Sequence, residues 1–294
     1  MSSSLVSSLI ETQEFATLPP VAARVLKLLE DDNIDIRNIS KVIEADASLT
    51  LKLLRVANSP LYATRTEISS IHQAIITLGL NRLTNIVLGV SIFSRFLLSS
   101  QKEASELMQK FWWHSSCTGI VAKALSAKIK KFYRENEFIG GLLHDIGKLA
   151  MLQYDAGKYA KVIELISEQN MLDHDAEREV FGTDHMEVGE HIAVLWKLPE
   201  ELTNIIAHHW RPASAPSSKE LVSVVRFADL LCEMWGAGIY EGYREINFET
   251  EEAWITLKNS YPDLQDLDVE IFTFELEEEF QKSAQFLNLL VQSA

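Results

Sequence analysis

The chain reads FIGGLLHDIGKL from Phe138 to Leu149, an apolar run that only a few polar side chains interrupt. Those side chains are His144, Asp145 and Lys148. Burying a carboxylate and an ammonium group without compensation is costly, so both groups need partners. Two kinds of partner are open: a metal ion, or an internal ion pair between Asp145 and Lys148 near a helix end, where residues three apart are neighbours.

Histidines and aspartates elsewhere in the chain extend this segment into an ordered set. In chain order the set comprises His114, His144, Asp145, His185, His208, His209 and Asp229. Imidazole and carboxylate groups suit borderline to hard divalent metals such as iron, manganese or zinc. A single histidine on a helix is more often a packed or surface residue. The ordered set, rather than any one member, therefore predicts a metal site with hydrolytic or redox chemistry.

The remaining histidines are expected to lie outside this site. His72 falls in the amino-terminal part of the chain, where a surface or capping position is expected. His174 stands between two aspartates in an expected turn, where solvation is favoured. His191 follows His185 by six positions, which places it on another face of the same helix.

Hydrophobic spacing predicts helices along most of the chain. Pro19-Pro20 opens a segment with apolar residues at i, i+4, i+7 and i+8, which is the spacing of one helical face. Asp46 and Ser70 stand where the N-caps of two later helices are expected. Residues 1–100 read as several short helices. Longer helices are expected at about 105–130, 137–144, 185–196, 199–209 and 220–235, so the candidate ligands come from several helices, as in a metal site inside a helical bundle.

We therefore predict an all-α protein with an amino-terminal helical lobe at 1–100 and a second helical lobe at 101–294. The carboxy-terminal part of the second lobe is an acidic extension, in which 271–274 are expected to be extended and 276–290 helical. Between Glu241 and Phe280 there are 13 acidic and two basic residues, which accounts for most of the net charge of −15. This acidity disfavours direct nucleic-acid binding. A solvated face or a protein-docking surface remains open for the acidic run.

Composition predicts a cytoplasmic protein with no membrane segment. An apolar share of 47% is enough for a large core, and two cysteines fit a reducing compartment. Residues 1–14 lack the basic and apolar regions of a secretory signal. The most apolar segment, 85–98, contains Arg95 and is too short to span a bilayer.

The ordered His and Asp residues resemble those of the HD superfamily of metal-dependent phosphohydrolases. Other segments resemble the HDOD (HD-related output domain) branch of bacterial signalling proteins. These segments are Leu18-Pro19-Pro20, Ala57-Asn58-Ser59-Pro60-Leu61-Tyr62, Ala74-Ile75-Ile76-Thr77-Leu78-Gly79, Phe111-Trp112-Trp113-His114-Ser115, 140–148, and Asp184-His185-Met186-Glu187-Val188-Gly189. Together they cover roughly residues 15–230.

This resemblance implies a dinuclear site for a divalent metal, with iron or manganese favoured. It implies that His114, His144, Asp145 and Asp229 hold one metal, and that Asp145 bridges to a second metal held by His185 and by one or both of His208 and His209. Asp145 would serve the catalytic centre directly, and Lys148 would stabilise charge on the phosphate or assist the leaving group.

Two functions follow from the resemblance. The first is a metal-dependent phosphohydrolase or phosphodiesterase acting on a phosphoester or nucleotide. The second is a catalytically silent output module that binds a protein signalling partner, with the metal structural or absent. The related cyclic-dinucleotide phosphodiesterases carry a Gly-Tyr-Pro signature after their paired histidines, whereas Trp210-Arg211-Pro212 stands here. Some also carry a glutamate where this chain has Lys110, so a third metal and cyclic di-GMP hydrolysis are not expected.

Overall fold

The computed structural model describes residues 18–29, 35–59, 62, 66–99, 105–240, 247–248, 250–265, 271–277 and 280. These residues are helical or lie in turns and loops, and no strand occurs among them. The predicted all-α fold is therefore confirmed. None of the helices in this part of the chain is long and apolar enough to cross a membrane.

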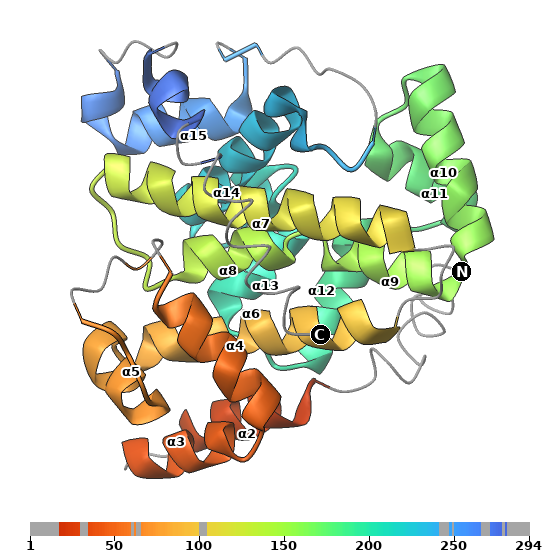
Figure 1. The fold of residues 1–294 in the computed structure, drawn as a ribbon. Helices are drawn as coiled ribbons and strands as arrows, with labels where there is room; N and C mark the ends of the chain where they lie inside the picture. Colours follow the sequence, from red (N-terminus) through yellow and green to blue (C-terminus); the bar gives the residue numbers. More distant parts are fainter. Residues whose placement is uncertain are drawn as a thin grey trace. The chain divides into compact units, whose positions relative to one another are not determined.

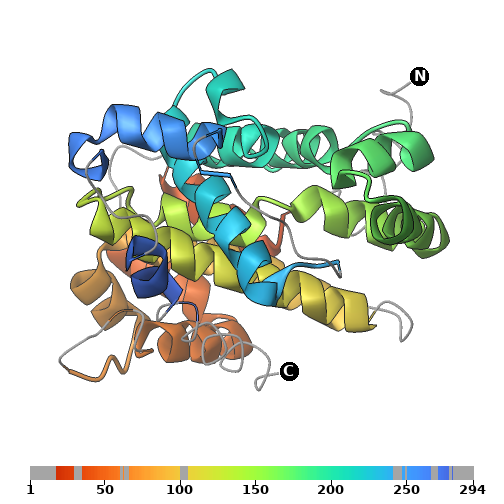
Figure 2. The same ribbon diagram turned by 90° about the horizontal axis from the view of Figure 1, so that it is seen from above.

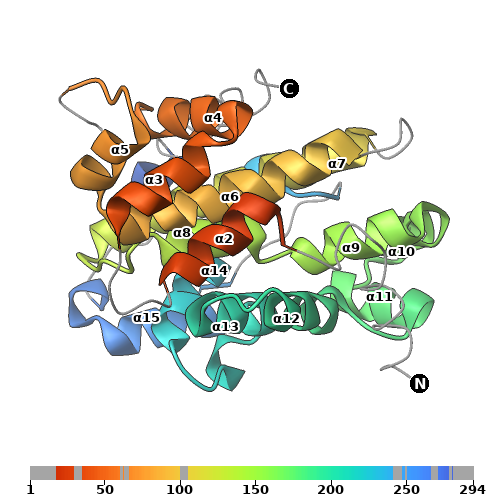
Figure 3. The ribbon, with the colours of Figure 1, turned by 90° about the horizontal axis from the view of Figure 1, so that it is seen from below.

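The chain divides into two compact units, whose described residues lie within 18–99 and within 105–280. The first unit consists of α2 (Pro20–Leu29), α3 (Ile36–Glu44), α4 (Ala47–Ala57), α5 (Ile71–Leu78) and α6 (Leu80–Ser99). Within it, α6 contacts α2, α4 and α5 (Figure 3). The assignment of residues 1–100 and 101–294 to two lobes of an HDOD module stays a prediction.

Short polar side chains set the helix boundaries of the first unit. Asp46 caps α4 by accepting from the Leu49 amide at 2.9 Å, as expected. Asn58 ends α4, and its side chain accepts from the Ile68 amide at 2.7 Å and donates to the carbonyl oxygens of Leu54 and Ile68. One asparagine thus joins the end of α4 to the segment before α5.

The second unit contains the longer helices and the candidate ligands. Its α-helices are α7 (Ser105–Lys128), α8 (Asn136–Leu143), α9 (Ile146–Tyr154), α10 (Ala156–Gln169), α11 (Asp173–Phe181), α12 (His185–Leu195), α13 (Glu200–His208), α14 (Lys219–Cys232) and α15 (Glu252–Ser260). Shorter turns are η2 (Pro212–Ser214), η3 (Glu233–Ala237) and η4 (Pro262–Leu264). In Figures 1 and 2, α7 and α8 lie side by side, and both contact α14.

Close backbone approaches let these helices converge. A Cβ on Gly141 of α8 would lie 2.6 Å from the Cα of Gly119 on α7, so glycine is required where the two helices meet. The expected extended piece at 271–274 is wrong, because residues 271–277 are helical. Phe272 and Leu276 are buried four residues apart, the spacing of one helical face. The predicted helix at 276–290 lies mostly outside the described residues.

Candidate metal centre

The second unit brings most of the predicted ligands into one buried cluster. Its members are His114 within α7, His144 and Asp145 between α8 and α9, His185 at the start of α12, His209 at the end of α13, and Asp229 within α14. Each is at most 3% exposed. The cluster thus draws on five regions of the helical bundle, and no two neighbouring helices alone could build it.

The chain bends between α8 and α9, at His144 and Asp145. The helix expected at about 137–144 corresponds to α8, which ends at Leu143, and α9 begins at Ile146. Asp145 stands at the N-cap position of α9 and makes no capping hydrogen bond. Its carboxylate therefore remains available to the cluster.

Each histidine of the cluster is oriented through its Nδ1 atom. The partners are the Ala237 carbonyl for His114 (3.0 Å), the Gly141 carbonyl for His144 (2.8 Å), the Ile206 carbonyl for His209 (3.1 Å) and Glu177 Oε2 for His185 (2.6 Å). Because these partners are acceptors, each Nδ1 carries the proton and each Nε2 is directed inward. Metal-binding histidines are commonly oriented in this way.

The inward atoms of the cluster divide into two groups. In the first group, the Nε2 of His114 lies 3.1 Å from Asp229 Oδ1 and 3.3 Å from the Nε2 of His144. Asp145 Oδ2 lies 3.4 Å from the His144 Nε2 and 3.8 Å from the His114 Nε2. We call these four residues the first subsite.

The second group gathers around the other oxygen of Asp145. Asp145 Oδ1 lies 3.5 Å from the Nε2 of His185 and 3.6 Å from the Nε2 of His209, and these two nitrogens are 3.2 Å apart. We call these three residues the second subsite. Asp145 Oδ1 accepts no hydrogen bond from any described residue. An unpaired carboxylate oxygen at the meeting point of two histidine pairs fits a bridging metal ligand.

Electrostatics inside the cluster follow from burial and charge. Burial alone would raise the pKa of Asp229, but the hydrogen bond with His114 and the charge of Arg226 hold it well below its ordinary value. Burial, with His144 and His185 nearby, holds the pKa of His209 well below its ordinary value. Both groups are thus kept in the deprotonated form that a metal ligand requires.

His185 behaves differently because an acidic side chain faces its outer nitrogen. Burial lowers the pKa of His185, but Glu177 outweighs burial and raises the pKa to about 9. Glu177 Oε2 accepts from both the Nδ1 and the backbone amide of His185, at 2.6 and 2.9 Å. Metal binding at the His185 Nε2 would therefore release a proton near neutral pH.

Lys148 is held between two carboxylates at the edge of the cluster. Its Nζ lies 2.9 Å from Asp145 Oδ2 and 2.7 Å from Asp173 Oδ2, and the residue is 6% exposed. The ion pair that we considered as an alternative to a metal site is present together with the histidine cluster. The two readings of the segment 138–149 are therefore compatible.

Three residues that hold members of the cluster in place were not predicted from the sequence. Glu177 and Asp173 come from α11 and reach His185 and Lys148, and nothing in their sequence spacing indicates this. Arg226 Nη1 donates to Asp229 Oδ2 at 2.7 Å, and its guanidinium carbon lies 3.9 Å from the centre of the Trp210 ring. The i,i+3 spacing of Arg226 and Asp229 on one helix could have revealed this pair.

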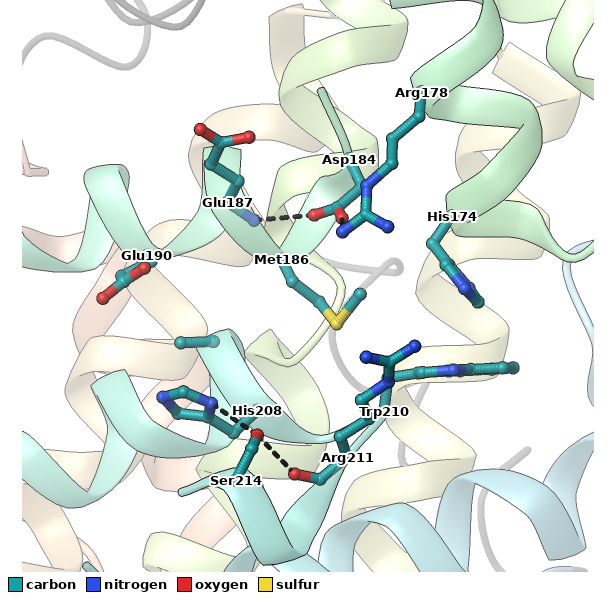
Figure 4. Close-up of a pocket in the computed structure, with 11 residues that line it drawn as sticks. His174, Arg178, Asp184, Met186, Glu187, Glu190, His208, Trp210, Arg211 and Ser214 are labelled. Atoms are coloured by element: carbon teal, nitrogen blue, oxygen red, sulfur yellow. Dashed lines mark hydrogen bonds and ion pairs between the residues drawn. The ribbon is translucent and has the colours of Figure 1, made fainter. Parts of the chain in front are cut away.

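The structure leaves His208 apart from the other candidate ligands. The half-buried side chain of His208 contacts Ser214 Oγ through its Nδ1 at 3.1 Å and lines a separate pocket (Figure 4). Of the paired histidines, His209 alone therefore joins the cluster. His174 also differs from expectation, because it lies within α11, is 4% exposed and lines the same pocket.

Comparisons with known proteins agree with these features. Fold and cluster together define an all-α protein with a buried histidine and aspartate centre. The family model of the HDOD domain matches residues 15–212, so the chain belongs to the HDOD family. An uncharacterised protein of Treponema pallidum (strain Nichols) is 27% identical over 215 residues. That match covers 72% of this chain and 41% of the relative, so the chain spans less than half the length of that protein.

Solved structures show the same fold. An HDOD domain protein of unknown function from Geobacter sulfurreducens is 26% identical, with a TM-score of 0.76 and 93% coverage of each chain. A protein from Shewanella amazonensis SB2B, named as a candidate phosphohydrolase, is 21% identical, with a TM-score of 0.73 and 98% coverage of each chain. At 21% identity, the similarity to the Shewanella protein shows only that the two proteins share a fold.

Proposed function

We propose that this HDOD protein is a metal-dependent phosphohydrolase acting on a phosphoester or nucleotide. The observation that carries the proposal is the position of Asp145, whose two carboxylate oxygens face two different groups of inward-directed histidine nitrogens. The ligands would be His114, His144, Asp145 and Asp229 for one ion, and Asp145, His185 and His209 for another.

The donor set fits iron or manganese. Neutral imidazoles and carboxylates are ligands that these ions accept, and thiolates are not among the clustered side chains that the structure describes. A pair of bound divalent ions supplies an activated hydroxide and a positive clamp for a phosphoryl group. The first subsite offers four protein ligands and the second offers three, which leaves more room for a substrate oxygen at the second.

Lys148 is suited to assist at this site through its remaining donor. An ammonium group has three donors, and the two ion pairs with Asp145 and Asp173 occupy at most two of them. The third can contact a phosphoryl oxygen while the two carboxylates fix the position of the nitrogen. Asp173 would thus position Lys148, and Lys148 would stabilise negative charge as the phosphoester bond breaks.

A second candidate function is favoured by the burial of the same cluster. No candidate ligand in the cluster is more than 3% exposed. A substrate must reach the reacting atoms, whereas a metal that only stabilises the bundle is best enclosed. The alternative is therefore a catalytically silent output module in which a structural metal supports binding of a protein signalling partner.

Metal analysis and an activity screen separate these functions. The purified protein would be analysed for bound metals and assayed with phosphomonoesters, nucleotides and cyclic nucleotides in the presence of Mn²⁺ or Fe²⁺. His185→Ala removes a buried candidate ligand, and His191→Ala removes an exposed histidine six residues further along α12. This pair controls for the loss of any histidine from that helix.

The outcomes are distinct. Stoichiometric metal that His185→Ala lowers and His191→Ala preserves, with turnover abolished by Asp145→Ala, supports the hydrolase. Metal without turnover on any phosphoester supports the silent module. If the wild-type protein binds neither Mn²⁺ nor Fe²⁺, or if both histidine variants bind metal as the wild type does, the metal proposal is wrong.

A further inference from the structure

A pocket outside the metal cluster has a polar lining that the proposed hydrolysis does not use. It has a cavity volume of about 270 Å³ and lies among the ends of α11, α12 and α13 and the turn η2. This volume lies just below the range typical of sites for drug-sized ligands, roughly 300–1,000 Å³. A small molecule or a single functional group would therefore fill it.

A buried histidine in the pocket wall is under-satisfied. His174 is 4% exposed, and its Nδ1 makes no hydrogen bond with any described residue. The nearest carboxylate oxygens, on Asp173 and Asp175, lie 3.5 Å from Nδ1 and Nε2. A polar atom buried without a hydrogen-bond partner is costly unless a ligand supplies one.

Two arginines approach the same space from different elements. Figure 4 shows the side chains of Arg178, from α11, and Arg211, from the turn after α13, directed toward one another across Met186. Arg178 is paired with Asp184, but no ion pair of Arg211 is found among the described residues. Like charges that converge on one cavity repel each other, so an anion between them would relieve the repulsion.

Two acidic residues of the pocket, Glu187 and Glu190, lie on its other side, whereas Asp184 is paired with Arg178. In Figure 4 the carboxylates of Glu187 and Glu190 are separated from Arg211 and His174 by the width of the pocket. Glu187 is also engaged by the Thr183 hydroxyl at 2.6 Å. This arrangement leaves room for one anionic group at the arginine end and disfavours a ligand with a second anionic group at the other end.

We propose that this pocket binds a small molecule through one phosphate group, held by Arg211 and His174 and flanked by Arg178. The planar fork of an arginine matches phosphate oxygens, and Trp210 lines the same pocket beside His174. A carboxylate has the same charge preference but fewer oxygens to share among three donors. This site is separate from the proposed metal centre and does not depend on hydrolysis.

Calorimetric titration of metal-free protein with inorganic phosphate, and separately with acetate, tests the proposal. Phosphate is expected to bind at millimolar concentrations and acetate more weakly. Arg211→Gln should weaken phosphate binding by about tenfold or more, since hydrogen bonds to charged groups are worth about 1.5–3 kcal/mol. Arg37→Gln makes the same change at an exposed arginine of α3 and should leave phosphate binding unchanged.

Because Arg211 is exposed, its replacement is not expected to unfold the protein. His174→Gln provides a second variant, in which phosphate binding should fall while the circular dichroism spectrum is preserved. The proposal is overturned if metal-free protein does not bind phosphate, if Arg211→Gln binds it as tightly as Arg37→Gln, or if acetate binds better than phosphate. None of these outcomes depends on whether the protein is a hydrolase.

Discussion

Gly147 controls how closely α9 can approach α12, and its replacement by alanine tests the geometry of the metal centre. A Cβ at this position would lie 1.9 Å from the carbonyl oxygen of His185, 2.7 Å from its carbonyl carbon and 2.9 Å from its Cα. All three are backbone atoms of a candidate ligand. No side-chain rotation can relieve the overlap, so α9 and α12 must move apart.

The cost follows from two opposing effects. Overpacking a well-packed interior costs about 1–3 kcal/mol, and a clash with backbone atoms belongs at the upper end. Alanine regains up to about 1 kcal/mol over glycine through its higher helix propensity. Gly147→Ala should therefore lower the free energy of unfolding by about 2 kcal/mol. It should also displace His185 and weaken metal binding at the second subsite.

Urea denaturation of metal-free protein measures the first effect, and metal titration measures the second. Gly157→Ala is a matched control in α10, because the nearest atom to its Cβ is Asp155 Oδ1 at an ordinary 3.4 Å. The control should be as stable as the wild type or more stable by up to about 1 kcal/mol. If Gly147→Ala matches the control in stability and metal affinity, the close approach of α9 and α12 is wrong.

Three further perturbations test the surroundings of the centre and the other unit. Glu177→Gln removes the charge that raises the pKa of His185 to about 9. Because burial remains, NMR titration of metal-free protein should show the pKa of His185 falling below the ordinary 6.5. Glu135→Gln, a control at a buried glutamate elsewhere, should leave the pKa of His185 near 9. Wild-type protein should therefore lose a stabilising contribution as the pH rises through about 9, and Glu177→Gln should not. Lys148→Met leaves the buried carboxylate of Asp145 and the partly buried carboxylate of Asp173 without their cation, so Tm should fall in metal-free protein and recover in part with Mn²⁺. An unchanged Tm would contradict the pairing. Asn58→Ala removes three side-chain hydrogen bonds and should cost about 1–3 kcal/mol in urea denaturation, whereas a loss below about 0.5 kcal/mol would show that these bonds contribute little.

Helical periodicity was enough to predict where most ligands would stand. Apolar spacing and caps placed His114, His185 and Asp229 on three separate helices, and the structure has them on α7, α12 and α14. Those features are local, so sequence reveals them. The choice between His208 and His209 is not local, because it depends on the direction that each side chain takes at the last turn of α13.

The supporting contacts could not be predicted, for a related reason. His114 Nδ1 is paired with the Ala237 carbonyl, 123 positions away in sequence, and a backbone carbonyl carries no residue-specific signal. His174 was expected to be solvated because aspartates flank it, yet packing of α11 buries it beside Trp210. At 271–274 we expected an extended piece, but burial follows the i,i+4 pair of Phe272 and Leu276 on one helical face.

The pocket and the metal centre share structural elements that link the two proposals. Trp210 lines the pocket, directly follows the candidate ligand His209, and stacks on Arg226, which holds Asp229 of the first subsite. A ligand that shifts the Trp210 ring would therefore act on residues of both subsites. Binding free energies at coupled sites are reciprocal, so metal binding would change phosphate affinity by the same factor as phosphate changes metal affinity. The enclosed cluster and the pocket would then act as coupled sites whether or not the proposed centre catalyses hydrolysis.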